Sequence, residues 1–170
     1  NRLLSITLSL VEKDLFTRDI RLMKKMVGRP KIKANLDEMK EVFLNLIMNA
    51  TQAMPTGGEL KITTFVDRNN KVKVEIADTG VGIPRKNLNR IFDPFFTTKA
   101  AGEGTGLGLT IVQKIVERHG GKVNQRSCKN SKNKTCSNHQ SVKNNYISKI
   151  ERVQKVESNI KKQRGKKVWR

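Results

Sequence analysis

The spacing of apolar residues predicts a chain in which helices and strands alternate. Apolar residues within the first eleven positions indicate a helix, although their spacing is ambiguous. From Asp19 to Val27, apolar residues alternate with charged ones, which predicts a strand. Residues 28–30 contain Gly and Pro and end it. Ile32 and Ala34 then predict a second, short strand.

The clearest helix runs from Leu36 to Met54, where apolar residues recur at helical spacing. Asp37 and Glu38 occupy its first turn, where the helix dipole favours negative charge. The sequence Pro-Thr-Gly-Gly at 55–58 ends it. We therefore expect an amphipathic helix with one apolar face.

The middle of the chain predicts a hairpin followed by two helices. Strands are expected at Glu59–Asp67 and Lys71–Asp78, joined by a short polar turn. A short helix is expected from Pro84 to Ile91. A Gly-rich loop, Thr97–Gly106, precedes a last helix from Leu107 to Arg118.

Two asparagines, Asn45 and Asn49, lie four residues apart and share a face of the long helix. A carboxamide oxygen is a hard neutral ligand that suits Mg²⁺. The alternative is an ordinary solvated helix face, since such pairs are common.

A second motif, Asp78-Thr-Gly-Val-Gly-Ile-Pro, follows a strand directly. Its carboxylate can accept a hydrogen bond from an exocyclic amine, and Gly80 and Gly82 let the backbone approach a flat ligand. The alternative is a plain Gly-rich turn.

The third motif spans residues 91–99 and contains three phenylalanines. Phe92 and Phe95 are predicted to be core residues, whereas Thr98 and Lys99 can meet phosphate groups.

The fourth motif, Gly102–Leu109, exposes successive backbone N–H groups before a helix N-terminus, where anions bind. It is not a Walker loop, because the Gly-Lys-Ser/Thr ending is absent. A dinucleotide fold is disfavoured, because no βαβ unit with an acidic residue follows.

Together and in this order, the four motifs resemble the nucleotide-binding boxes of the GHKL superfamily. The resemblance runs from about Ala34 to Gly121, and the phrases Asn45–Met54, Phe95–Lys99 and Gly102–Leu109 look like sensor histidine kinases. It implies an α/β (α+β) Bergerat fold, which is a two-layer sandwich. Its mixed, mostly antiparallel sheet is covered on one face by helices.

The resemblance also implies roles for single residues with ATP and Mg²⁺ as cofactors. Asn49 resembles the metal ligand, Asp78 the adenine contact, and Asn45 and Lys99 the catalytic residues at the phosphates. Phe95 and Phe96 match the aromatic box beside a lid formed by Lys99–Gly104. The implied ATP-binding set is Asn45, Asn49, Asp78, Gly80, Gly82, Ile83, Phe96, Thr98, Lys99, Gly102, Gly104, Thr105, Gly106, Leu107 and Gly108.

Asn45 departs from the hydrolytic relatives, which place a glutamate base there. We therefore expect phosphoryl transfer to a histidine outside this chain, with activity of the isolated chain in doubt. His119 is predicted to be structural, and His139 lies in a polar stretch. The implied partners are a dimerisation and histidine-phosphotransfer segment, in cis upstream or in trans, and a response regulator receiver domain. The alternative is a defective ATP-binding or interaction module with a basic tail.

The net charge of +20 is concentrated at the end of the chain. Residues 122–170 hold 15 of the 35 Lys and Arg but only 2 of the 15 acidic residues. Nucleic-acid binding is nevertheless considered unlikely, because aromatic residues for base stacking are sparse in this segment. The Lys/Asn/Ser bias suggests a shifted reading frame, with a genuine basic tail as the alternative. Cys128 and Cys136 are read as incidental thiols, since with His139 they match no common zinc site.

The expected organisation has three parts. Residues 1–18 form the end of a dimerisation region or a connecting helix, 19–123 the ATP-binding domain, and 124–170 a disordered tail. Lys122 and Val123 begin a strand, and 146–160 show some helical spacing. No apolar run is long enough to cross a bilayer, so we expect no membrane contact from this chain and a cytoplasmic location, although a longer parent could be anchored. The missing initiator Met suggests a fragment.

Overall fold

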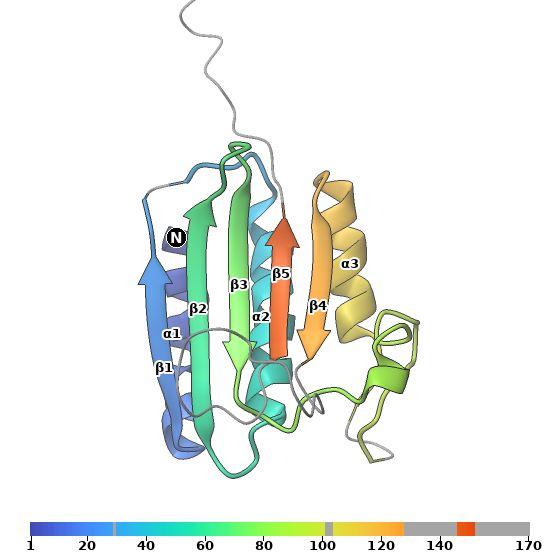
Figure 1. Ribbon diagram of the computed structural model, residues 1–170. Helices are drawn as coiled ribbons and strands as arrows, with labels where there is room; N and C mark the ends of the chain where they lie inside the picture. Colours follow the sequence, from blue (N-terminus) through green and yellow to red (C-terminus); the bar gives the residue numbers. More distant parts are fainter. Residues whose placement is uncertain (29, 101–103, 128–145, 152–170) are drawn as a thin grey trace, which may run out of the picture.

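A computed structural model describes residues 1–28, 30–100, 104–127 and 146–151, the last six by their backbone. Its five-stranded sheet has the order β1-β2-β3-β5-β4. All three helices lie on one face of this sheet (Figure 1). The strands are β1 (Ile20–Met26), β2 (Gly58–Val66), β3 (Val72–Asp78), β4 (Lys122–Ser127) and β5 (Tyr146–Glu151). The helices are α1 (Arg2–Thr17), α2 (Leu36–Gln52) and α3 (Gly108–Arg118), with a 3₁₀ turn, η1, at Arg85–Asn87.

The predicted sheet type is confirmed. β1 pairs with β2 in parallel, whereas β2–β3, β3–β5 and β5–β4 are antiparallel pairs. The β2–β3 hairpin places Leu60 opposite Asp78 and Ile62 opposite Ile76. Because strand side chains alternate between faces, this register directs the apolar residues of both strands toward the helices.

One core lies between the helices and the sheet. It includes Val42, Leu46 and Ile47 from α2, together with residues of both other helices and of β1, β2 and β3. Helix α1 contributes Leu4, Leu8, Val11 and Leu15 to this same core. Helix α1 therefore packs onto the same core as the strands and the other two helices.

The predicted strand at Ile32 and Ala34 is wrong, because the structure has no regular element between residues 30 and 35. Gly28 has a φ of +72° and turns the chain out of β1. Ile32 and Ala34 still pack against the core, which explains their apolar character without a strand. The predicted helix from Pro84 to Ile91 shrinks to the single turn η1.

The end of the chain departs most from expectation. Residues from Asn124 onward were predicted to lie outside the sheet, yet Asn124–Ser127 continue β4, and Tyr146–Glu151 form β5 between β3 and β4. The helical reading of 146–160 is therefore wrong for the first six of these residues. Only alternate positions of a one-sided sheet need apolar side chains, so a polar sequence is compatible with it. Cys128, Cys136 and His139 lie outside the described residues.

His119 joins the two helices that border the functional site. It follows the last residue of α3, and its Nε2 accepts a hydrogen bond from the backbone N–H of Asn35 at 3.1 Å. Its Nδ1 donates to the carbonyl of Ile115 at 2.8 Å. Asn35 is in turn the N-cap of α2, so the structural role predicted for His119 is confirmed.

No helix in the described part of the chain is long and apolar enough to span a membrane.

Candidate functional site

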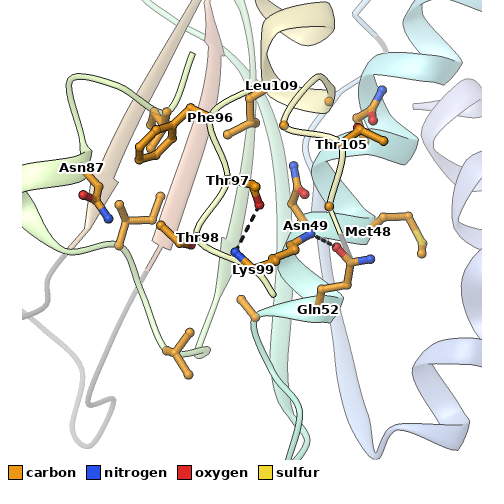
Figure 2. Close-up of a pocket in the computed structure, with 18 of the residues that line it drawn as sticks. Met48, Asn49, Gln52, Asn87, Phe96, Thr97, Thr98, Lys99, Thr105 and Leu109 are labelled. Carbon is orange, nitrogen blue, oxygen red and sulfur yellow. Dashed lines mark hydrogen bonds between the residues drawn. The ribbon is translucent and has the colours of Figure 1, made fainter. Parts of the chain in front are cut away.

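A cavity of about 520 Å³ lies between α2, α3 and the loops that follow β3 (Figure 2). Eleven predicted site residues line it: Asn45, Asn49, Gly82, Ile83, Phe96, Thr98, Lys99, Gly104, Thr105, Gly106 and Gly108. Its volume lies within the range of pockets that hold small-molecule ligands. Residues of all four motifs therefore lie on the cavity wall. The Asp78 motif contributes Gly82 and Ile83, but not Asp78 itself.

Helix α2 presents a polar stripe to the cavity. Asn45, Asn49 and Gln52 follow at positions i, i+4 and i+7, and all three line the wall. The stripe ends at the last residue of α2, because the helix gives way there to the turn before Gly58. The side-chain Nδ2 of Asn45 donates to the carbonyl of Glu41 at 3.1 Å, which leaves its Oδ1 facing Gly108.

Asp78 ends β3 directly before the segment that lines the cavity. Asp78 is buried, with only 1% of its surface exposed. One carboxylate oxygen, Oδ1, accepts the Gly80 N–H at 2.9 Å. The other, Oδ2, is buried and has no hydrogen-bond partner among the described residues.

Burial raises the pKa of Asp78 to about 6, and the Gly80 hydrogen bond offsets only part of this rise. A buried acceptor without a donor costs free energy, so such a group in a native structure needs an explanation. A ligand with an N–H donor would give Oδ2 the hydrogen bond that it lacks.

Gly80 permits the close contact between this segment and α2. A Cβ at Gly80 would lie 2.4 Å from the carbonyl oxygen of Ala53, which no larger residue could tolerate. The next residue, Val81, donates its N–H to that same carbonyl at 2.9 Å. Ala53 and Val81 both line the cavity, so Asp78 and Gly80 lie just behind its wall.

The Gly-rich loop leads into the N-terminus of α3 at the cavity wall. The first helical N–H bond runs from Ile111 to the Leu107 carbonyl, so the preceding N–H groups of the first turn have no partner within the helix. No side chain caps this end. With the positive end of the helix dipole, the arrangement suits an anion such as phosphate.

Two glycines make this geometry possible. Gly106 has a φ of +67°, and a Cβ there would lie 2.3 Å from the backbone carbon of Phe95. A Cβ at Gly108 would lie 2.9 Å from Oδ1 of Asn45. Side chains at these positions would push α3 and its loop away from the α2 stripe.

The third motif divides its aromatic residues in an unexpected way. Phe95 was predicted to be core, but it is 74% exposed, and its backbone has a φ of +64°. Phe96, the next residue, lines the cavity instead. The guanidinium group of Arg90 stacks on its ring, 4.7 Å from the ring centre. Phe92 is half-buried.

Sequence reasoning missed several cavity residues, namely Met48, Gln52, Ala53, Val81, Pro84, Asn87, Ile91, Thr97 and Leu109. Gln52 could have been found by extending the spacing of the two asparagines by one more turn. Conversely, the predicted residues Asp78, Gly80 and Leu107 do not line the wall, and Gly102 lies outside the described residues.

A profile of the histidine kinase-, DNA gyrase B-, and HSP90-like ATPase family matches residues 34–143. The chain belongs to this family. Among its relatives, the sensor histidine kinase ZraS of Escherichia coli (strain K12) is 42% identical over 124 residues. These are 72% of this chain and 26% of ZraS, so the chain spans about a quarter of that relative.

Other relatives in this ATPase family are kinases as well. Sporulation kinase A of Bacillus subtilis (strain 168) is 46% identical over 92 residues, which cover 54% of this chain and 15% of that protein. The nucleotide-free catalytic domain of histidine kinase ThkA superposes with a TM-score of 0.70 at 30% identity, covering 89% of this chain and 92% of that one. The chain is therefore an ATP-binding catalytic domain of the sensor histidine kinase type.

Proposed function

We propose that this domain holds ATP with Mg²⁺ in the cavity and transfers the γ-phosphoryl group to a histidine outside this chain. The observation that carries the proposal is the buried, unpartnered Oδ2 of Asp78, just behind the cavity wall that includes Ala53 and Val81. The exocyclic amine of adenine is a donor of the kind this oxygen lacks. Gly82 lets the flat base approach the backbone, Gly80 holds this segment against α2, and Ile83 and Phe96 offer apolar walls.

The phosphates would lie at the opposite end, between the two helices. The N-terminus of α3, the loop glycines and Thr105 offer N–H and hydroxyl donors, and Lys99 offers a positive charge. Thr98 lines the same side, and Gly102 and Leu107 belong to this loop by the family resemblance.

The residues present also fit Mg²⁺. Among the described residues, no group of three or more His, Cys, Asp or Glu side chains could hold a metal ion. Mg²⁺ typically takes few protein ligands and keeps water and phosphate oxygens. A single carboxamide oxygen from Asn49 suits that mode, and the ion would neutralise phosphate charge there.

Transfer is favoured over hydrolysis by Asn45. A carboxamide cannot take a proton from water, and its Nδ2 is already bonded to the carbonyl of Glu41. Asn45 can instead orient the phosphate end beside Gly108. Both ring nitrogens of His119 have hydrogen-bond partners, which makes His119 a poor acceptor of the phosphoryl group. We therefore place the phosphoryl-accepting histidine on a dimerisation and phosphotransfer segment.

A response regulator receiver domain is the proposed final recipient. Histidine kinase ThkA has been solved in complex with the response regulator TrrA, and that kinase is 29% identical to this chain with a TM-score of 0.66. Because ATP is the proposed substrate, we place the reaction in the cytoplasm. No observation favours the alternative of a defective interaction module.

The test supplies γ-labelled ATP and Mg²⁺ to the chain, with and without the dimerisation and acceptor segment of ZraS. We expect acid-labile label on that segment, none on the chain alone, and slow release of phosphate. Asn45→Glu should increase phosphate release, because it places a base four residues before Asn49. Acid-labile label on His119, or rapid hydrolysis by the unaltered chain, would contradict the proposal.

A further inference from the structure

Gln52 is the third residue of the polar stripe and the last residue of α2. Its Oε1 accepts a hydrogen bond from Nζ of Lys99, and both residues line the cavity (Figure 2). These two side chains are 47 positions apart in sequence. The contact therefore links the loop of the third motif to the helix that carries the two asparagines.

The Lys99 backbone is also held on its own side of the cavity. Its N–H donates to Oγ1 of Thr97 at 3.1 Å (Figure 2). Gly104 packs against both residues, since a Cβ there would lie 2.8 Å from Thr97 Oγ1 and 3.0 Å from Lys99 Cδ. The lysine stem thus rests between the loop and Gly104, and Gln52 fixes where its ammonium group ends.

The chemistry of Gln52 suits this task better than a carboxylate would. A lysine side chain has up to about 2 kcal/mol of rotamer entropy to lose when it is fixed at a ligand. A hydrogen bond in the ligand-free protein removes part of that loss beforehand. A neutral amide uses one of the three ammonium donors and leaves the positive charge uncancelled.

The position at the end of α2 adds to this effect. A helix C-terminus carries partial negative charge and favours a cation. At the other wall, the N-terminus of α3 is positive. An ammonium held at Gln52 therefore adds positive charge on the side of the cavity where the helix itself supplies none.

We infer that Gln52 is a positioning residue, which presents the Lys99 ammonium to the outer phosphates and so sets the preference for ATP over AMP. The inference rests on the proposed function and adds a residue that acts through Lys99. AMP has only the phosphate next to the ribose, so its affinity should depend little on this pair.

The experiment is a double-mutant cycle with Gln52→Ala, Lys99→Met and the double variant. Calorimetry with Mg²⁺ gives the affinity of each for ATP and for AMP. Gln52→Ala should weaken ATP binding about fivefold, which is the loss of one ordinary side-chain hydrogen bond. AMP affinity should stay within about twofold, and Gln52→Ala should have no further effect when Lys99 is already methionine.

Two further variants separate position from charge and from helix damage. Gln52→Glu keeps the acceptor but cancels the lysine charge, so ATP affinity should fall further than with alanine. Gln113→Ala is the matched control, because Gln113 lies on α3, bonds to Glu117 at 2.8 Å and does not line the cavity. Its ATP affinity should match that of the unaltered chain.

The outcomes distinguish this inference from the proposed function. If the unaltered chain binds neither ATP nor AMP, the proposed function itself fails. If it binds both, but Gln52→Ala leaves ATP affinity unchanged or weakens it equally with and without Lys99, only the positioning role is overturned.

Discussion

Asp78 combines its proposed role in adenine binding with a cost to stability, and replacing it by asparagine separates the two. Its carboxyl group is buried, with one oxygen on the Gly80 N–H and the other without a partner. Asp78→Asn keeps the Gly80 acceptor and removes the charge. We expect the variant to bind ATP more weakly, while its stability loses the pH dependence that Asp78 causes.

The magnitude follows from the pKa of Asp78, which burial raises from 3.8 to about 6. One pH unit corresponds to about 1.36 kcal/mol, so the charged form costs the folded state about 3 kcal/mol. Because the folded pKa is raised, this contribution to stability is full below pH 3.8 and is lost as the pH rises to about 6. About 2 kcal/mol of the loss falls between pH 4.5 and pH 8.

The assay is urea unfolding of the unaltered chain and of Asp78→Asn at pH 4.5 and pH 8. Relative to the unaltered chain, Asp78→Asn should gain about 2 kcal/mol between the two pH values. Calorimetry at pH 8 should show ATP affinity reduced by roughly 1–3 kcal/mol, the cost of a lost hydrogen bond to a charged group.

Asp67 provides a matched control in the β2–β3 turn. The backbone N–H of Lys71 lowers the pKa of Asp67, with further help from Lys73 and Asn69. Because its folded pKa is lowered, ionised Asp67 stabilises the fold above pH 3.8, and this stabilisation is lost only at lower pH. Asp67→Asn should therefore reduce stability equally at pH 4.5 and pH 8. Its ATP affinity should not change, because Asp67 lies at the turn end of the β2–β3 hairpin, at the opposite end of β3 from Asp78 and Gly82.

The reasoning about Asp78 is refuted if Asp78→Asn follows the same pH dependence as the unaltered chain. An unchanged ATP affinity of Asp78→Asn would separately contradict the proposed hydrogen bond between Oδ2 and the adenine amine.

Asn49→Ala should reduce ATP affinity strongly with Mg²⁺ and little with EDTA, because the side chain acts through the ion; calorimetry showing equal losses would exclude a metal role. His119→Ala should lower the free energy of unfolding by about 1 kcal/mol, since the Asn35 N–H loses its side-chain acceptor. Urea unfolding tests this against Lys114→Ala on the exposed face of α3, and equal stability of both variants would contradict it.

Several elements could be predicted from local sequence because their burial pattern repeats within a few residues. Helix α2 was predicted from Leu36 to Met54 and runs to Gln52, and α3 begins one residue after its predicted start. The β2–β3 hairpin was predicted within one residue at each end.

The start of β4 at Lys122 was predicted, but its extension to Ser127 and the whole of β5 were not, because their partners are distant in sequence. β5 pairs with β3, so that Ile150 lies opposite Val74 and Ile147 opposite Ala77. Ile147 and Ile150 are three residues apart, which matches helical spacing equally well. Only the presence of an open strand edge on β3 favours the extended form.

The sequence by itself determined the order of the four motifs, the shared face of Asn45 and Asn49, and the absence of a glutamate base. These depend on residue identity and on helical geometry over a few positions. Tertiary structure decided three other features: the unpartnered oxygen of Asp78, the hold of Gln52 on Lys99, and the link from His119 to Asn35 across 84 residues. Burial and hydrogen bonding between distant segments exist only once the sheet and helices have packed, so no local pattern records them.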